Sequence, residues 1–532
     1  MSSLTGGQIV VRTLRDLGAQ SIFSVSGNQI LPIYDAAGAC DLQIFHMRHE
    51  SAAAYAAAAA AEITNQPGIV LVSAGPAFVA ALAGVAAARS MEVPLLFLSG
   101  ASATTDANAG GFQDFDQRGA ARTTCKTSLG VTAVGQIRTA LSRAWELAQA
   151  SIPGPVHVSL PADMLLASSP DEPNVQDEPS AISLLSSHDE AVLQAVTQQL
   201  TQARRPLIIA RPSAARGEAG KALWRIAHYL QIEPVITECP RGLRDLKYSE
   251  IIRHYPESDA VLVIAPADFA VGFLARPTIA SEGQLFLLDD PGDPPPRRLP
   301  DMHIQIPPEL ALRYLEKRLT GPIAVIDDWM RLWSHPAASE MLSGPSSGDG
   351  LHPLEVAAHV RSVLQPDDII VLDGGEFGQW IRLGLRDIPN RVIWNSKFGG
   401  IGGSIPMAIG VSATGHPGRA IVLLGDGAAG YHFSELETAV RYAIPVMAII
   451  GNDARWAAEW FQQVSRYGPE RTFETTLSPA RYDQAAVGLG ALGAHVTDTA
   501  ALDQALTASM STRVPVCLNV HIRSLRSAAV VA

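Results

Sequence analysis

Cysteine is scarce in this chain of 532 residues, and charge is also sparse. The four cysteines (Cys40, Cys125, Cys239 and Cys517) stand far apart and form no CxxC pair. This spacing argues against a disulfide framework and a zinc site, so we expect reduced, mostly buried thiols. Charged residues make up 17% of the chain, and the net charge is −12. A nucleic-acid-binding face is basic, so we expect small organic substrates and no nucleic acid.

We also expect no targeting or membrane segment. The start, MSSLTGGQIVVRTLRDLG, does not have the basic and then apolar pattern of a secretory signal, and it predicts an amphipathic helix in a cytoplasmic protein. Residues 68–88 carry no charge over a length sufficient for a membrane span of about 20 residues. Residues 73–76 (SAGP) would interrupt such a helix. We therefore predict a buried strand, a turn and a core helix, and no membrane contact.

The organisation of the chain indicates several domains, because a single core stops growing at roughly 250–300 residues. Segments 167–190 and 337–353 are rich in Ser, Pro, Asp and Gly, as linkers are. We predict domains at 1–168, 190–335 and 353–525. Short apolar runs alternate with helical patterns, which predicts an α/β fold of three doubly wound parallel-sheet domains. The clearest runs are 206–210, 260–265, 284–289, 369–373, 420–426 and 445–450.

Acidic side chains follow two of these predicted strands. Asp426, in Gly425-Asp426-Gly427, comes directly after the run 420–424, at the strand end where ligands bind in open α/β sheets. The next strand, 446–450, is followed by Asn452 and Asp453. If the strand ends are adjacent, Asp426 and an oxygen of Asn452 or Asp453 bind one ion, and such donors suit Mg²⁺ with phosphate oxygens. A lone Gly-Asp-Gly also fits any tight turn.

Between these strands, the sequence SELE at 434–437 has a capping-box pattern, which predicts that a helix begins there. The full segment reads GDGAAGYHFSELETAVRYAIPVMAIIGND. It resembles the motif, running from GDG to a paired Asn-Asn, of the thiamine-diphosphate family that includes acetolactate synthase, benzaldehyde lyase, pyruvate decarboxylase and the 2-hydroxyacyl-CoA lyases. The family has a pyrimidine-binding, a middle and a diphosphate-binding domain, which the resemblance assigns to the three segments in this order.

The resemblance also implies the metal ligands. Asp426, Asp453 and the backbone carbonyl of Arg455 match the family's Mg²⁺ ligands, and Asn452 shapes the turn. Asp453 departs from the family's Asn. The added charge should strengthen the hold on the metal and weaken the attraction for phosphate.

A catalytic carboxylate is implied at Glu50, in HMRHESAAAYAAAAAAE. In the family, this glutamate hydrogen-bonds the aminopyrimidine ring and helps to deprotonate the thiazolium carbon. The chemistry needs a carboxyl group that takes up a proton near neutral pH, which alanine-lined apolar surroundings favour. The alternative is that Glu50 only complements the positive end of a helix that begins there. His49 and His46 are weaker candidates for substrate contact.

Two glycine-rich loops resemble other cofactor contacts of the family. In FGGIG at 398–402, Ile401 matches the apolar wedge between the two cofactor rings, and the Gly399 carbonyl faces the pyrimidine. DGGEFG at 373–378 matches a second phosphate-contacting loop, where we expect backbone amides to bind while the Glu376 carboxylate turns away. The remaining cofactor-binding candidates are Phe377, Gly425, Gly427, Ala428 and Asn452.

Polar residues near the amino terminus are candidates for substrate contact. Residues 24–29 correspond to a pocket loop in the family, and GFQD at 111–114 resembles a segment whose glutamine lies near the thiazolium. Asn28, Gln29 and Gln113 would orient a carbonyl or carboxylate, or are turn residues. Trp456 and Trp460 are either pocket walls or core residues.

We predict a lyase or carboligase that depends on thiamine diphosphate and Mg²⁺. Activities like those of acetolactate synthase or benzaldehyde lyase, on 2-oxo acids or 2-hydroxy ketones, are compatible. The first alternative is a 2-hydroxyacyl-CoA lyase or oxalyl-CoA decarboxylase, which GGFQDFDQRGAARTTCK resembles. The second is a non-catalytic cofactor-binding homologue. FAD is not expected, because few glycines follow the first middle-domain strand. The short tail after strand 514–520 leaves little to cover a CoA moiety. The family implies a homodimer core, commonly within a tetramer.

Overall fold

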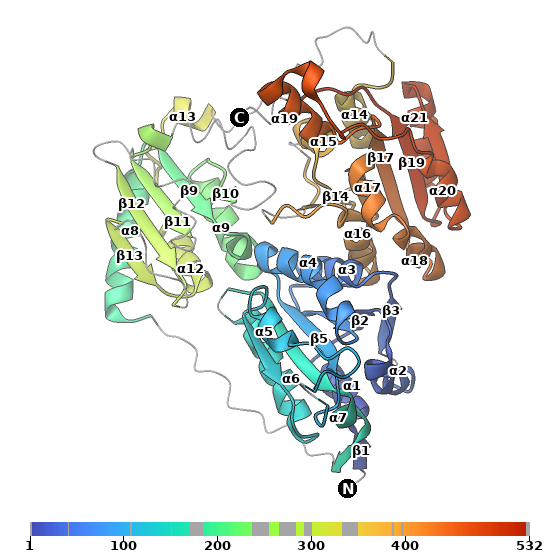
Figure 1. Ribbon diagram of the computed structural model, residues 1–532. Coiled ribbons are helices and arrows are strands. Elements are labelled where there is room, and N and C mark those ends of the chain that lie inside the picture. Colours follow the sequence, from blue (N-terminus) through green and yellow to red (C-terminus); the bar gives the residue numbers. More distant parts are fainter. Residues whose placement is uncertain are drawn as a thin grey trace. The chain divides into compact units, whose positions relative to one another are not determined.

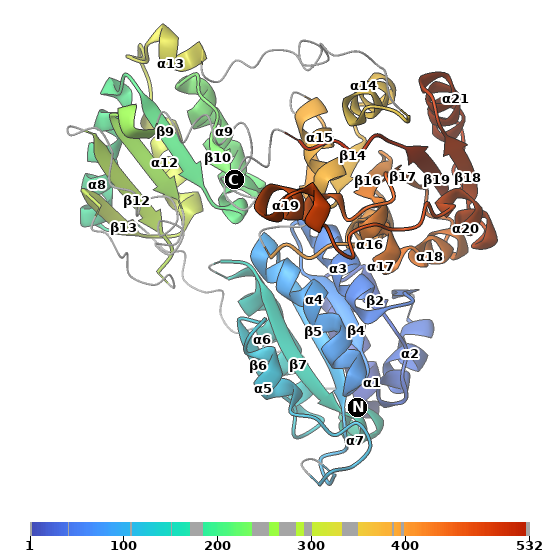
Figure 2. The same cartoon turned by 45° about the horizontal axis from the view of Figure 1, so that its top comes forward.

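The computed structural model describes residues 3–40, 42–106, 109–150, 152–170, 185–236, 255–264, 283–291, 300–331, 349–385, 388–394 and 398–527. The chain forms two compact units, shown in Figures 1 and 2. One comprises Met1–Gln149, Pro153–Asn174 and Ala337–Ala532, and the other Ala150–Ile152 and Val175–Pro336. The predicted α/β fold with several parallel sheets is confirmed. Cys239 and most of the two predicted linkers lie outside the described residues.

The amino-terminal part of the first unit is a six-stranded parallel sheet of order β3-β2-β4-β5-β7-β6. Its strands are β2 (Ser21–Ser24), β3 (Gln43–His46), β4 (Gly68–Val72), β5 (Leu95–Ala101), β6 (Thr127–Gly130) and β7 (Pro155–Pro161). The helices are α1 (Gly6–Asp16), η1 (Asn28–Ile30), α2 (Leu31–Gly38), α3 (Glu50–Thr64), α4 (Pro76–Met91), α5 (Gln117–Ala121), α6 (Gln136–Gln149) and α7 (Ala162–Leu166). Two short strands, β1 (Ser3–Thr5) and β8 (Ser168–Pro170), pair antiparallel.

Two predictions for this part are confirmed. The amphipathic helix at the amino terminus is α1, whose apolar residues face the core. The uncharged stretch forms the buried strand β4, a turn and helix α4. Among the described residues, no helix has the length and apolar character that crossing a membrane requires.

The carboxy-terminal part of the same unit is a second six-stranded parallel sheet, of order β15-β14-β16-β17-β19-β18. Its strands are β14 (Ile369–Leu372), β15 (Val392–Trp394), β16 (Ala420–Gly425), β17 (Val446–Asn452), β18 (Leu492–Val496) and β19 (Val516–His521). The helices are α14 (Pro353–Val363), α15 (Glu376–Gly384), α16 (Ser404–Ala413), α17 (Asp426–His432), α18 (Glu435–Arg441), α19 (Ala457–Tyr467), η7 (Pro469–Arg471), α20 (Tyr482–Gly488) and α21 (Thr499–Met510).

The second unit has its own five-stranded parallel sheet, of order β10-β9-β11-β12-β13, and its own apolar core. Its strands are β9 (Pro206–Ala210), β10 (Val235–Ile236), β11 (Ala260–Ile264), β12 (Gln284–Asp289) and β13 (Met302–Gln305). The helices are α8 (Ser187–Gln202), η2 (Pro212–Ala215), α9 (Gly217–Tyr229), η4 (Tyr255–Glu257), α12 (Pro308–Arg318) and α13 (Asp327–Arg331).

Helix α3 joins the two sheets of the first unit. Every residue from Ser51 to Ala61 is buried, because α3 packs between α4 and α16 (Figures 1 and 2). The small side chains allow very close approach: a Cβ at Gly410 of α16 would stand 2.0 Å from the Ala56 carbonyl oxygen. A Cβ at Gly84 of α4 would stand 2.6 Å from the Cβ of Ala54. The alanine-rich sequence thus fixes the first residue of α3, Glu50, between two domains of one unit.

Candidate active site

The carboxyl ends of β16 and β17 are adjacent, as the sequence predicted. The two strands pair in parallel to their last residues, with Gly425 opposite Gly451. Asp426 begins α17 directly after β16, and Asp453 follows β17. The strand register therefore brings the two aspartates to the same edge of the sheet.

Asp426 is poorly stabilised by its own surroundings. It is 2% exposed, and its Oδ2 has no hydrogen-bond partner among the described residues. Burial, and then the negative charge of Asp453, raise the pKa of Asp426 to about 7, although the backbone amides of Gly427 and Arg455 oppose this shift. Burial also raises the pKa of Asp453. A divalent cation between the two carboxylates would remove this repulsion, so these residues fit a metal.

The oxygen ligands at this site favour a metal ion that also binds ligands other than protein groups. The described residues contain no group of three or more His, Cys, Asp and Glu side chains able to hold an ion. Two carboxylates and a backbone carbonyl suit Mg²⁺, which completes its octahedron with phosphate oxygens and water.

Asn452 is occupied in holding the loop. Its Nδ2 donates to the carbonyl of Ala480 and to Oδ1 of Asn519, both at 3.0 Å, while its Oδ1 accepts from the amide of Ala454 at 3.2 Å. Ala454 takes a left-handed conformation (φ +56°), so the chain turns sharply here. Asn452 therefore shapes the turn, and the carboxylate of Asp453 is the side chain available to an ion.

The residues around Gly425 differ in how much space they leave. A Cβ at Gly425 would meet nothing within 4 Å, whereas one at Gly427 would stand 2.7 Å from the Trp456 ring. Trp456 thus packs on the first turn of α17 and has a structural role there. Ala428 is buried in the same turn. The open side of Gly425 is the side on which a ligand has room.

The loop that carries Ile401 is fixed by a buried carboxylate. Asp373, at the end of β14, accepts hydrogen bonds from the amides of Gly402 at 3.0 Å and Ser404 at 3.2 Å, and burial raises its pKa. Gly399 and Gly402 have positive φ values of 74° and 82°, which favour glycine. Ile401 is half-buried against the core. Sequence reasoning missed this role of Asp373, because its partners lie about thirty residues away.

The neighbouring loop residues Glu376 and Phe377 face inward. The Glu376 carboxylate accepts a hydrogen bond from the amide of Ser527. The Phe377 ring packs against Gly451, where a Cβ would stand 2.5 Å from the ring. Phe377 is therefore a core residue that supports the strand end of β17.

Glu50 stands at the first position of α3 and is half-buried. In the described part of the chain, its carboxylate has no hydrogen bond or ion pair. His49 caps the helix by accepting from the amide of Ser51 at 3.1 Å. The unpartnered Glu50 carboxyl is available to a ligand.

His432 links the start of α3 to the Ile401 loop. Its Nδ1 lies 2.7 Å from the carbonyl of Gly402, and its Nε2 lies 2.8 Å from the Ser51 hydroxyl. Burial lowers the pKa of His432, so the ring is neutral, with Nδ1 donating and Nε2 accepting. This connection was not predicted.

Gln29 and Gln113 are brought together. Gln29 Nε2 donates to Gln113 Oε1 at 2.8 Å, and Gln29 Oε1 accepts from the Ser73 hydroxyl at 2.5 Å. Gln113 takes a positive φ of 61° and lines a pocket of about 460 Å³. Asn28 begins η1 and is exposed. Gln29 and Gln113 thus form a polar pair, while Asn28 stands apart from it.

The predicted start of a helix at 434–437 is confirmed by α18, but the capping box itself is wrong. Ser434 has helical backbone angles and makes no side-chain cap, and helix α17 already occupies the preceding residues. Glu435 is fully buried, and its carboxylate accepts the amides of Arg48 and His49. Glu437, the carboxylate that a capping box would use, pairs with Arg48 and Arg441 instead.

Comparison with known sequences gives concordant matches. A family model described as "Thiamine pyrophosphate enzyme, N-terminal TPP binding domain" matches residues 4–120, and the corresponding "C-terminal TPP binding domain" matches residues 373–520. A probable acetolactate synthase of Mycobacterium bovis is 26% identical over 544 residues, covering 97% of this chain and 96% of that protein. The 2-hydroxyacyl-CoA lyase 2 of Bos taurus is 27% identical over 557 residues, covering 92% and 85%.

Proposed function

Since the chain belongs to the thiamine-pyrophosphate enzymes, which act on acyl or aldehyde groups, we propose that it is a Mg²⁺-dependent lyase or carboligase. The reaction breaks or forms a carbon–carbon bond next to the carbonyl of a 2-oxo acid or a 2-hydroxy ketone. The observation that carries this proposal is the pair of aspartates at adjacent strand ends, one of them with a buried oxygen that has no partner in the described part of the chain.

In this proposal, Asp426, Asp453 and the Arg455 carbonyl hold Mg²⁺. The diphosphate lies on the open side of Gly425, bordered by Gly427 and Ala428. The extra negative charge of Asp453 increases the dependence of diphosphate binding on the cation, because two carboxylates repel phosphate unless a metal lies between them.

Glu50 and Ile401 act on the rings of the cofactor. When bound, thiamine diphosphate supplies a carbon that becomes nucleophilic after it loses a proton. The Glu50 carboxyl, which has no partner among the described residues, would hydrogen-bond the aminopyrimidine and move the proton there. Ile401 stands on a loop that Asp373 fixes by hydrogen bonds, and it separates the two cofactor rings from each other. The Gly399 carbonyl accepts a hydrogen bond from the pyrimidine.

The polar pair Gln29 and Gln113 orients the substrate carbonyl, and the exposed Asn28 is a further candidate for substrate contact. The pairing of their amides supports this role, since each glutamine holds the other in a fixed rotamer. A 2-hydroxyacyl-CoA lyase is the second candidate function, because a relative of that name aligns over 92% of the chain.

The active site is completed by a second copy of the chain in a homodimer core, which assembles further into a tetramer. Several aromatic side chains near the candidate site residues are exposed in the single chain, among them Phe112, Tyr431 and Phe473. Helix α19, which follows the loop of Asp453, has no buried residue. Surfaces of this kind support an interface between copies.

The decisive experiment is a substrate panel assayed with added thiamine diphosphate and Mg²⁺. We expect turnover of a 2-oxo acid or an acyloin, with EDTA abolishing it. Turnover confined to acyl-CoA substrates would favour the second candidate function. If no carbonyl substrate reacted while the cofactor bound, the chain would be a non-catalytic homologue.

A further inference from the structure

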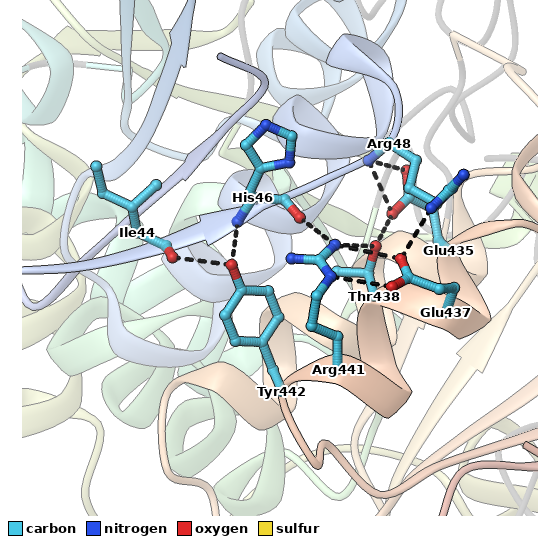
Figure 3. A network of polar contacts seen from close by, with 8 residues as sticks. All are labelled: Ile44, His46, Arg48, Glu435, Glu437, Thr438, Arg441 and Tyr442. Atoms are coloured by element: carbon cyan, nitrogen blue, oxygen red, sulfur yellow. Dashed lines mark hydrogen bonds and ion pairs between the residues drawn. The ribbon is translucent and has the colours of Figure 1, made fainter. Parts of the chain in front are cut away.

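Helix α18 holds the segment that leads into Glu50 (Figure 3). The main contact between α18 and this segment is made by the fully buried carboxylate of Glu435. Glu435 Oε1 accepts from the amide of Arg48 at 3.0 Å and from the amide of His49 at 3.1 Å. Its Oε2 accepts from the Thr438 hydroxyl at 2.7 Å. Arg48 and His49 are the two residues directly before Glu50.

The same helix holds the strand just upstream. Among the described strands β3 is at the edge of its sheet, so one side of its backbone is not paired with another of them. The Tyr442 hydroxyl accepts from the amide of His46 at 2.8 Å and donates to the carbonyl of Ile44 at 3.2 Å. The Arg441 guanidinium donates to the His46 carbonyl at 2.7 Å. Backbone groups of Ile44, His46 and Arg48 are therefore bonded to α18 and to Tyr442 directly after it, as Figure 3 shows. The amide of His49 is bonded to Glu435 as well.

The contact at Glu435 costs more free energy than is needed merely to join the two segments. Burying a carboxylate costs free energy, and burial raises the pKa of Glu435 despite the hydrogen bonds that it accepts. An exposed ion pair between Arg48 and Glu437, at 3.0 Å, already joins the same two segments. What Glu435 adds is a fixed direction for two successive amides at the entrance to α3.

We propose that Glu435 is a positioning residue for Glu50: by binding the amides of Arg48 and His49, its carboxylate sets where the Glu50 carboxyl stands against the cofactor. This inference rests on the proposed role of Glu50. A displacement of about 1 Å at a reacting group can cost on the order of 10²-fold in rate, so a small loosening at residues 48 and 49 is enough to matter.

The first measurement needs no cofactor. Amide hydrogen exchange of the cofactor-free protein, resolved at residues 44–51, reports directly on the two hydrogen bonds. We expect exchange of the Arg48 and His49 amides to become at least tenfold faster in Glu435→Ala and to remain within threefold of native in Glu435→Gln. The glutamine retains an oxygen that can accept both amides, as Oε1 does in the native protein.

The second measurement concerns the loaded protein. We expect Glu435→Ala to slow proton exchange at the reactive carbon of bound thiamine diphosphate by about 10²-fold, with the dissociation constant of the cofactor changed less than threefold. Glu435→Gln should restore the exchange rate to within about fivefold of native. A merely structural role would lower cofactor binding and proton exchange together, without rescue by glutamine.

The matched control is Glu62→Gln, at the other end of α3. Its carboxylate pairs with Arg391 at 2.9 Å and also joins the two sheets of the unit. It should leave both exchange rates within twofold of native. If Glu435→Ala does not fold, Tyr442→Phe tests the same attachment of residues 44–49 to residues 435–442. It removes the hydroxyl bonded to His46 and should speed exchange of that amide at least fivefold.

Native rates at the amides and at the cofactor carbon in Glu435→Ala would overturn the inference, as would equal losses in the alanine and glutamine variants. Native amide rates at His46 in Tyr442→Phe would also count against it. Failure of the proposed function is distinguishable: the native protein and Glu50→Gln would then show the same slow proton exchange at the cofactor, whatever the amide measurements give.

Discussion

At the scale of single residues, Glu50 is the side chain on which the proposed chemistry depends. Its carboxyl is half-buried and unpartnered in the described part of the chain. Glu50→Gln keeps the size of the side chain and removes its proton transfer. General acid–base catalysis contributes about 10²–10⁴-fold, so we expect a rate loss in that range for proton exchange at the cofactor carbon, with the cofactor still bound. Native exchange in Glu50→Gln would rule out this role.

Some site residues could be predicted from sequence and others could not. The proximity of Asp426 and Asp453 could be predicted because each follows a recognisable apolar strand within one contiguous motif. The roles of Asp373, His432 and Glu435 were not predicted, because each makes hydrogen bonds to backbone groups that are distant in the sequence. Local patterns do not encode such contacts. The local pattern at Ser434 was misleading, since Glu437, the carboxylate that fitted a capping box, pairs with Arg48 and Arg441 instead.

At the scale of elements, the close packing of α3 against α16 is the feature that brings the two domains of the first unit together. A Cβ at Gly410 would stand 2.0 Å from the Ala56 carbonyl oxygen, which is backbone and cannot move aside easily. We expect Gly410→Ala to lower the free energy of unfolding by about 2 kcal/mol, measured by denaturant titration. The control is Gly38→Ala in α2, where a Cβ meets nothing within 4 Å. An unchanged midpoint in Gly410→Ala would contradict this account of the packing.

Strand β7 carries a second testable feature, the fully buried His157. Its ring nitrogens lie 2.8 Å from the hydroxyls of Ser99 and Ser128. Burial, and then the charge of Arg118, lower the pKa of His157 from 6.5 to about 3. The folded state therefore binds fewer protons than the unfolded state between these values. The stability that the neutral ring contributes is complete above pH 6.5 and is lost as the pH falls toward 3.

We expect this titration to cost about 2.5 kcal/mol of unfolding free energy between pH 7 and pH 4.5. His157→Gln retains hydrogen-bonding groups without the charge, so its pH dependence over this interval should be flatter by about that amount. Parallel stability curves for the native protein and His157→Gln would show that His157 does not control acid stability.

The elements themselves were largely predictable. The apolar runs at 206–210 and 284–289 are strands with those limits, and the run at 420–426 is a strand that ends one residue earlier, because buried parallel strands require continuous apolar sequence. The position of α17 was not foreseen. It begins at Asp426 itself, in a segment whose glycines and alanines give little helical periodicity.

At the scale of the whole molecule, the account proposes that each active site takes Glu50 from one chain and Asp426 from another. Mixing two inactive variants tests this. Glu50→Gln and Asp426→Asn homodimers should each be inactive, whereas co-refolded mixtures should contain heterodimers with one intact site. We expect about a quarter of native activity from an equal mixture with random pairing, because half of the dimers then carry one intact site of two.

Activity no greater than that of the separate variants would contradict the shared site. The control is a mixture of Asp426→Asn with Asp453→Ala, whose altered residues belong to the same cluster. Every pairing of these two variants lacks an intact metal site, so no recovery is expected.

The alternation of apolar runs with helical patterns predicted the parallel sheets of the molecule. It did not predict that the chain divides into two compact units. Residues 1–149 and the carboxy-terminal part cluster together because α3 and α16 pack so closely, and this contact joins segments more than 300 residues apart. The composition predicted the alanine-rich helix α3, but it did not predict that α16 packs against it.

The most direct test of the central claim is a calorimetric titration of thiamine diphosphate into the protein, with Mg²⁺ and then with EDTA. The account predicts saturable binding with Mg²⁺, at least 10²-fold weaker binding with EDTA, and the same loss in Asp426→Asn with Mg²⁺ present, because the buried oxygen then no longer carries the charge that holds the ion. Equal affinity of the native protein and Asp426→Asn for thiamine diphosphate, or no binding by the native protein with Mg²⁺, would contradict it.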